Sequence, residues 1–260
     1  MTDLREIAAD LTAEQCVLDK IVAGLSDGQW AMPTPSEGWT VSDQIGHLTY
    51  FDGAAAAAIA SLEAFQASME ELIRVGVDID ELTLHRSLAP HELLAAWRAN
   101  RARLDEVAST LAEDTRVIWY GPTMSARSFL TARLMEVWAH GQDIIDAFGA
   151  ETLTSDRLRH IARLGFITRR WSYGNRGMEV PDVDVFVDLA APSGEAWRFG
   201  PDGAVDVIRG PAVDFCLVVT QRRHVKDTCL DVKGDMARDW MEKAQAFAGP
   251  ATDGPAPRSA

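Results

Sequence analysis

The sequence predicts two domains: a four-helix bundle over residues 1–150, then a small α+β domain over residues 151–248. Three observations lead to this prediction. The chain has 260 residues, which is enough for two domains. Its first part contains four long stretches with apolar residues at helical spacing, joined by loops of moderate length. After Gly149 the pattern changes to short alternating stretches and short helical ones between glycine and proline turns.

Apolar spacing and end signals together define the four bundle helices. Thr40 is a hydroxyl N-cap with Asp43 three residues later, close to a capping box. Pro90 suits the first turn of a helix, Ser125 suits an N-cap, and Gly149 suits the residue that follows a helix. The predicted helices are residues 2–24, 40–65, 90–111 and 125–149. Between them, a loop is predicted at residues 76–80 and a turn at Gly121-Pro122.

The second domain is predicted from alternation and from turn residues. The predicted strands are residues 183–189, 196–199, 204–208 and 229–232. The predicted helices are residues 158–171, 210–220 and 235–247. Residues 249–260 contain two glycine-proline steps among polar residues, which predicts a flexible tail.

Charge and cysteine content narrow the possible partners. The formal net charge is −14, which argues against nucleic acid and against an anionic membrane surface as partners. Three cysteines without close spacing, Cys16, Cys216 and Cys229, form neither a disulfide framework nor a cysteine zinc site. The first residues lack the basic and apolar segments of a signal peptide. We therefore expect a cytoplasmic protein, either a monomer or a homodimer.

One face of the fourth predicted helix carries charged side chains at helical spacing. Arg133, Glu136, His140 and Asp143 follow one another at intervals of three, four and three residues. A carboxylate and an imidazole four residues apart can bind one divalent metal ion, but they can equally belong to a solvated ion-pair ladder. His47, on the second predicted helix, is the best candidate for a third ligand; the alternative is a hydrogen-bonded core histidine. Asp143 suits an acceptor that orients His140, or a surface ion pair.

Two arginines end the helix predicted at residues 210–220. Arg222 and Arg223 can clamp a carboxylate, or they can act as cations at a helix C-terminus, which the helix dipole favours. The chain has no GxSxG, Walker A, GxGxxG or HExxH motif. The sequence therefore offers no nucleophile motif or nucleotide site to compete with the metal prediction.

Two stretches resemble a known family. Gly38-Trp39-Thr40-Val41 followed by His47-Leu48, and later Arg133-x-x-Glu136-x-x-x-His140-x-x-Asp143, resemble the mycothiol-dependent maleylpyruvate isomerase group of the DinB-like metalloproteins. The likeness covers about residues 1–150 and implies a DinB-like four-helix bundle. It implies that His47, Glu136 and His140 bind a metal ion. Zinc is the first expectation, and such a donor set also suits nickel, iron or manganese.

The second half is similar to the C-terminal domain of the same group. The stretches that carry this similarity are Gly210-Pro211-Ala212-Val213-Asp214, Thr220-Gln221-Arg222-Arg223 and Leu230-x-Val232-x-Gly234-Asp235. In the isomerases an arginine of this domain faces the active site, which implies that role for Arg222 or Arg223. The likeness is greatest to an uncharacterised metal-binding branch of the group.

The resemblance implies a metal-dependent enzyme that uses a low-molecular-weight thiol, with mycothiol as a cosubstrate. Such an enzyme would be a transferase or an isomerase, performing S-transfer or cis–trans isomerisation on a small, acidic electrophile. Metal coordination lowers the pKa of a thiol and presents a thiolate at neutral pH. Two alternatives remain open at this point: a non-catalytic module that binds metal or a small molecule, and a hydrolase or lyase that activates water without a thiol.

Overall fold

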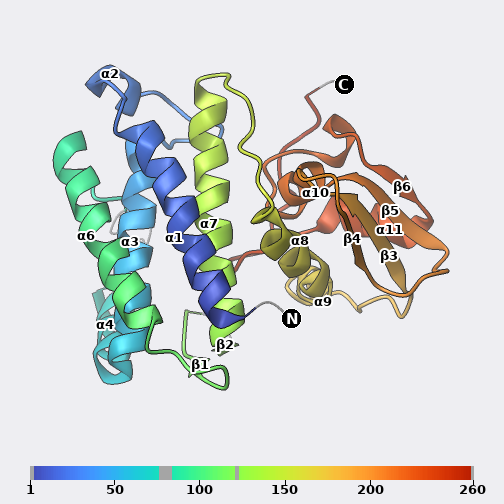
Figure 1. Ribbon diagram of the computed structural model, residues 1–260, viewed down its shortest axis with the longest axis horizontal. Helices are drawn as coiled ribbons and strands as arrows, with labels where there is room; N and C mark the ends of the chain where they lie inside the picture. The colour runs from blue at the N-terminus through green and yellow to red at the C-terminus, as the bar shows by residue number, and fades with distance from the viewer. Residues whose placement is uncertain (1–2, 76–83, 121–122, 259–260) are drawn as a thin grey trace. The chain divides into compact units, whose positions relative to one another are not determined.

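The computed structural model describes residues 3–75, 84–120 and 123–258. Contacts divide the chain into two compact units, Met1–Thr152 and Leu153–Ala260 (Figure 1). The loop predicted at residues 76–80 and the turn predicted at Gly121-Pro122 lie outside the described residues. Within the described ranges, no helix is long and apolar enough to cross a membrane.

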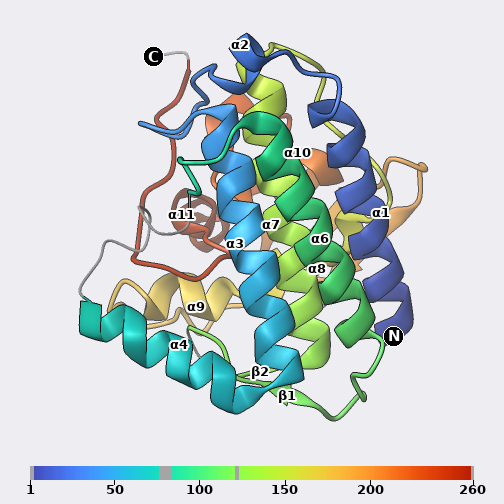
Figure 2. The same ribbon diagram turned by 90° about the vertical axis from the view of Figure 1, so that its left-hand side faces the viewer.

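Four long helices lie side by side in the first unit, as Figures 1 and 2 show. They are α1 (Leu4–Val22), α3 (Val41–Ala60), α6 (Pro90–Ala108) and α7 (Ala126–Ala147). The unit also contains α2 (Asp27–Trp30), α4 (Leu62–Val75) and a short antiparallel hairpin of β1 (Arg116–Val117) and β2 (Met124–Ser125). The prediction of an N-terminal helical bundle is confirmed.

Local signals set the start of α3 and α7 as the sequence predicts. Thr40 and Asp43 form the capping box, in which the Thr40 N–H donates to Asp43 Oδ2 at 2.8 Å. Ser125 caps α7 by accepting from the Ser128 N–H at 3.2 Å. The predicted helix of residues 40–65 differs, because it ends at Ala60. Ser61 is extended, and its Oγ accepts from the Ala64 N–H, so this hydroxyl starts α4 as a separate helix.

Apolar side chains of all four long helices form the core of the bundle. The fully buried members include Leu18, Ile45, Leu48, Trp97, Leu104, Leu130 and Leu134. Close packing also requires a residue without a side chain at Gly46 in α3. A Cβ there would lie 2.6 Å from the backbone carbonyl carbon of Leu84. The Leu84 backbone therefore packs directly on the α3 backbone, one residue before His47.

The second unit contains a four-stranded mixed sheet with the strand order β4-β3-β5-β6. The strands are β3 (Val185–Ala190), β4 (Ala196–Phe199), β5 (Asp206–Pro211) and β6 (Asp231–Lys233). Strand β3 pairs in parallel with β5 and antiparallel with β4, and β5 pairs antiparallel with β6. The helical elements are α8 (Leu158–Ile167), α9 (Arg169–Gly174), α10 (Ala212–Val219), the 3-10 turn η1 (Val225–Asp227) and α11 (Asp235–Lys243). The predicted small domain with helices and a sheet is confirmed.

Two predicted helices of this unit differ at their ends. The helix predicted at residues 158–171 is interrupted at Thr168, whose hydroxyl donates to the Leu164 carbonyl at 2.7 Å. The helix predicted from Gly210 starts at Ala212. Gly210 belongs to β5 with φ of 147°, and a Cβ there would lie 2.9 Å from the Cys229 carbonyl oxygen. The close approach of the neighbouring segment thus keeps this glycine in the strand.

Over its described part, the predicted flexible tail makes hydrogen bonds with other residues of the second unit. Thr252 accepts through its carbonyl from Gln221 Nε2 at 2.9 Å, and its N–H donates to Gln245 Oε1 at 3.3 Å. Near the end, the Arg258 N–H donates to Asp227 Oδ2 at 2.8 Å. Composition alone does not predict these contacts, because two of the three partners, Gln221 and Asp227, are 31 residues away in the sequence.

Candidate metal centre

Three side chains that the sequence singles out converge between α3 and α7. Glu136 Oε2 lies 3.1 Å from His140 Nε2 and 3.6 Å from His47 Nε2. The centroids of the two imidazole rings are 4.4 Å apart. One ligand atom from each residue lies within 4.8 Å of the other two. The spacing of four residues places Glu136 and His140 on one face of α7, and helix packing supplies His47.

Aromatic rings flank both imidazoles. The Trp39 ring stacks on His140 with a centroid distance of 6.0 Å and an interplanar angle of 12°, and it lies 5.3 Å from His47. The Phe51 ring lies 4.5 Å from His47 on the next turn of α3. The side chains of His47, Glu136 and His140 are only 17%, 22% and 9% exposed. The cluster is therefore largely enclosed by protein, with part of His47 and Glu136 exposed at its edge.

A chain of hydrogen bonds determines which nitrogen of His140 carries a proton. The Thr34 hydroxyl donates to the Trp39 carbonyl at 3.0 Å, so its oxygen accepts from Gln44 Nε2 at 2.9 Å. The amide oxygen of Gln44 then faces His140 Nδ1 at 2.5 Å and accepts its proton. This arrangement leaves the lone pair of His140 Nε2 directed at Glu136, as a metal ligand requires.

Gln44 thus occupies the position that the sequence assigns to Asp143. Asp143 is buried, and its Oδ2 accepts from Ser36 Oγ at 3.2 Å, in the loop before α3. Sequence reasoning missed Gln44, although it lies three residues before His47 on α3 and so close to the same helix face. The acceptor for His140 Nδ1 thus comes from the partner helix α3, and a role of Asp143 toward His140 stays a prediction.

The protonation states at neutral pH suit a cation. Burial, and to a smaller extent the nearby His140, lower the pKa of His47 to about 4, so the imidazole is neutral at pH 7. Burial raises the pKa of Glu136, but the interactions of this carboxyl with the imidazoles of His140 and His47 outweigh burial and hold the pKa well below its usual value. The cluster accordingly offers one carboxylate and two imidazole nitrogens.

The two separations between Glu136 and the histidines fit a divalent ion with an open position. In a tetrahedral site with bonds of about 2.0–2.1 Å, neighbouring ligand atoms are about 3.3 Å apart. The 3.1 Å and 3.6 Å separations in the cluster bracket this value. The carboxylate oxygen and the Nε2 lone pair are both acceptors, so a proton or a metal ion must lie between them. Two histidines and a glutamate are also a donor set found in catalytic zinc sites, where a fourth position remains open.

Arg222 and Arg223 follow α10 in the second unit. Arg222 Nη1 donates to the Thr220 carbonyl at 2.7 Å, and Arg223 Nη1 donates to the Arg222 carbonyl at 2.7 Å. Both backbone N–H groups donate to the Leu217 carbonyl. These bonds satisfy carbonyls at the end of α10, as expected for cations at a helix C-terminus. A role of either arginine toward substrate stays a prediction.

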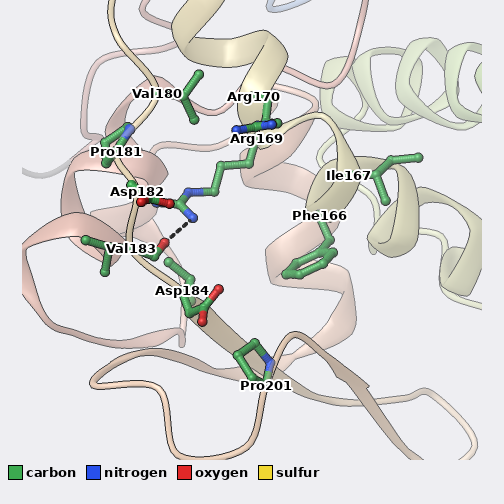
Figure 3. Close-up of a pocket in the computed structure, with 11 residues that line it drawn as sticks. Phe166, Ile167, Arg169, Arg170, Val180, Pro181, Asp182, Val183, Asp184 and Pro201 are labelled. Carbon is green, nitrogen blue, oxygen red and sulfur yellow. Dashed lines mark hydrogen bonds between the residues drawn. The ribbon is translucent and has the colours of Figure 1, made fainter.

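A pocket of about 400 Å³ lies in the second unit, between α8, α9 and the segment that leads into β3 (Figure 3). Its charged lining residues are Arg169, Arg170, Asp182 and Asp184. Arg169 Nη1 donates to the Val183 carbonyl at 2.6 Å, and the guanidinium carbon lies 5.8 Å from the centre of the Trp240 ring. Two cations face two acids, so the lining does not favour an anionic ligand.

Comparisons with known proteins agree with the fold. The family model described as the mycothiol maleylpyruvate isomerase N-terminal domain matches residues 11–145. Two uncharacterised proteins of Mycobacterium tuberculosis, from strains CDC 1551 / Oshkosh and ATCC 25618 / H37Rv, are each 41% identical over 252 residues. Each match covers 96% of this chain and 98% of the relative.

Solved structures of a mycothiol-dependent maleylpyruvate isomerase share the fold. The TM-score is 0.58 for one structure and 0.57 for a histidine-to-alanine mutant. Both are 20% identical to this chain and match 85% of it and 90% of their own length. The family match spans just over half of the 260 residues, and the two relatives match nearly all of them. This chain therefore belongs to the family of the mycothiol maleylpyruvate isomerase N-terminal domain.

Proposed function

We propose that this protein is a metal-dependent enzyme that uses a low-molecular-weight thiol of the mycothiol type. Its reaction is S-transfer to, or cis–trans isomerisation of, a small, acidic electrophile. The observation that carries the proposal is the convergence of His47, Glu136 and His140 within 4.8 Å in a member of this family. We assign zinc as the first candidate for the bound ion. Nickel, iron and manganese are the other candidates, because they bind the same donor atoms.

The protein residues hold the ion and prepare the site. A bound divalent ion lowers the pKa of a coordinated thiol and so supplies a thiolate at neutral pH. Glu136 provides the negative charge, and Gln44 keeps the Nε2 lone pair of His140 free by accepting the Nδ1 proton. The rings of Trp39 and Phe51 flank the imidazoles and limit access of water to them.

The residues that meet substrate are assigned by analogy with the family and by charge. We assign Arg222 or Arg223 to a carboxylate of the substrate. We assign Asp143 to support of the loop that carries Trp39, because it accepts from Ser36 in that loop. Burial raises the pKa of the Cys216 thiol, which keeps it protonated and unreactive. An external thiol therefore fits better than this cysteine as the nucleophile.

The test measures thiol chemistry on the zinc-loaded protein. Holoprotein is incubated with mycothiol and a panel of electrophiles, and conjugates and isomers are followed by mass spectrometry. We expect accelerated product formation that is lost in Glu136→Gln. The matched control is Glu113→Gln, because Glu113 pairs with Arg127 on the surface at 2.7 Å. This substitution should leave the activity unchanged.

Each other outcome assigns a different function. Turnover without added thiol would identify a hydrolase or lyase that activates water. Tight zinc binding without turnover of any electrophile would identify a binding module. A folded wild-type protein that shows no tight zinc site by titration would remove the proposal altogether.

A further inference from the structure

One buried carboxylate joins all four long helices of the bundle. Asp52 on α3 is fully buried, and its Oδ2 accepts from Gln15 Nε2 on α1 at 3.1 Å and from Trp97 Nε1 on α6 at 3.0 Å. Its Oδ1 accepts from Arg133 Nη2 on α7 at 2.9 Å. Each donor comes from a different helix, so the Asp52 carboxylate connects all four long helices through hydrogen bonds.

The ion pair at the centre of this group is almost completely removed from water. The side chains of Arg133 and Asp52 are 4% and 0% exposed. Arg133 Nε is also buried and has no hydrogen-bond partner among the described residues. Burying two charges costs about as much as their attraction returns, so apolar residues of the same size would stabilise the bundle equally well. A buried pair of this kind is best explained by the specificity of the arrangement that it imposes.

The arrangement imposed here is the register of α3 against α7. Asp52 lies five residues after His47 on α3. Arg133 lies five residues before the midpoint between Glu136 and His140 on α7. The two helices are therefore antiparallel, and the ion pair lies about 7.5 Å along their axes from the metal centre, at about 1.5 Å per residue. If one helix moved along the other, the same movement would break the ion pair and separate His47 from the Glu136 carboxylate.

We propose that Asp52 and Arg133 are positioning residues: their ion pair sets the register in which α3 presents His47 to α7. The proposal rests on the proposed metal centre. It adds a role for Arg133 that the family resemblance leaves unassigned. Neither residue is among the three candidate ligands, so both act through the placement of His47.

The experiment compares zinc affinity and stability in the same variants. Asp52→Asn keeps the size of the side chain but removes its charge, and Asp52→Asn with Arg133→Met removes both charges and leaves no unpaired ion. Zinc affinity is measured by competition with a chromophoric chelator, and folding by far-ultraviolet circular dichroism and denaturant titration. We expect the folded double variant to bind zinc about tenfold or more weakly, in line with the loss of residues that orient metal ligands.

A matched control separates positioning from general stability. Asp19 on α1 pairs with Arg98 of α6 at 2.6 Å and with Arg101 of the same helix. Asp19→Asn should lower stability but leave zinc affinity within about twofold of wild type, because this pair does not join α3 to α7. If Asp52→Asn does not fold, the zinc affinity of the charge-neutral double variant alone tests the positioning role.

The outcomes distinguish this inference from the proposed function. Wild-type zinc affinity in a folded double variant would overturn the positioning role and leave the metal centre intact. An equal loss of affinity in Asp19→Asn would also overturn it, because any loss of stability would then have the same effect. Absence of a tight zinc site in the wild-type protein would remove the proposed function and this inference with it.

Discussion

His47 makes the stability of the metal-free protein depend on pH. Burial, and then the nearby His140, lower its pKa from the usual 6.5 to about 4. Between these values the unfolded chain binds a proton at His47 that the folded protein does not bind, so stability falls as the pH falls. The contribution of neutral His47 to the free energy of unfolding is fully present above pH 6.5 and is lost as the pH falls to about 4. Over this range it amounts to about 3 kcal/mol, at 1.36 kcal/mol per pH unit. The side chain is 17% exposed, so solvent screening reduces this value little.

The measurement is the free energy of unfolding in urea, with a chelator present to remove metal. Wild type and His47→Gln are compared at about pH 7.5 and about pH 5, because pH 5 is still above the usual pKa of a glutamate. The glutamine has no titrating group, so wild type should lose about 2 kcal/mol more than the variant over this interval. Equal losses in the two proteins would show that His47 is not held neutral in the fold, and the reasoning would fail.

Two further predictions concern side chains around the centre. Gly46→Ala should destabilise the protein by about 1–3 kcal/mol in thermal or chemical unfolding, because the new Cβ would overlap the backbone of Leu84. Gly53→Ala on the same helix is the control, because its new Cβ would meet only the Asn100 side-chain amide and alanine favours the helix. A similar loss of stability in Gly53→Ala would contradict the packing argument. Gln44→Ala should weaken zinc binding about 10-fold to 100-fold without unfolding the bundle, because His140 Nδ1 loses its acceptor. Unchanged affinity in a chelator competition would show that Gln44 does not orient the ligand.

Much of the fold could be predicted from local sequence signals. The capping residues Thr40 and Ser125 place the starts of two helices correctly, because a cap acts on the first turn only. The breaks at Ser61 and Thr168 were not predictable from apolar spacing, which continues across both positions. There a hydroxyl bonds locally to the backbone, and the surrounding packing decides whether the helix stops or continues.

The candidate site was predictable only in part. The spacing of Glu136 and His140 indicates a shared helix face. His47 was a candidate third ligand from its place in the second predicted helix, and the family resemblance strengthened that prediction. Gln44 and Asp52 were missed because a polar residue inside a helix usually faces solvent. One signal existed for Asp52: it continues the buried stripe of positions 41, 45 and 48 on α3, where an apolar residue is expected.

By itself, the sequence determined where helices form and which side chains share a helix face, because both depend on residues a few positions apart. Only the tertiary structure decided which groups meet across helices. It brings His47 to Glu136, places the Gln44 amide against His140, and pairs Arg133 with Asp52. These contacts join residues on different helices that are 81 to 96 positions apart in the sequence. Their geometry therefore depends on how the helices pack and not on local spacing.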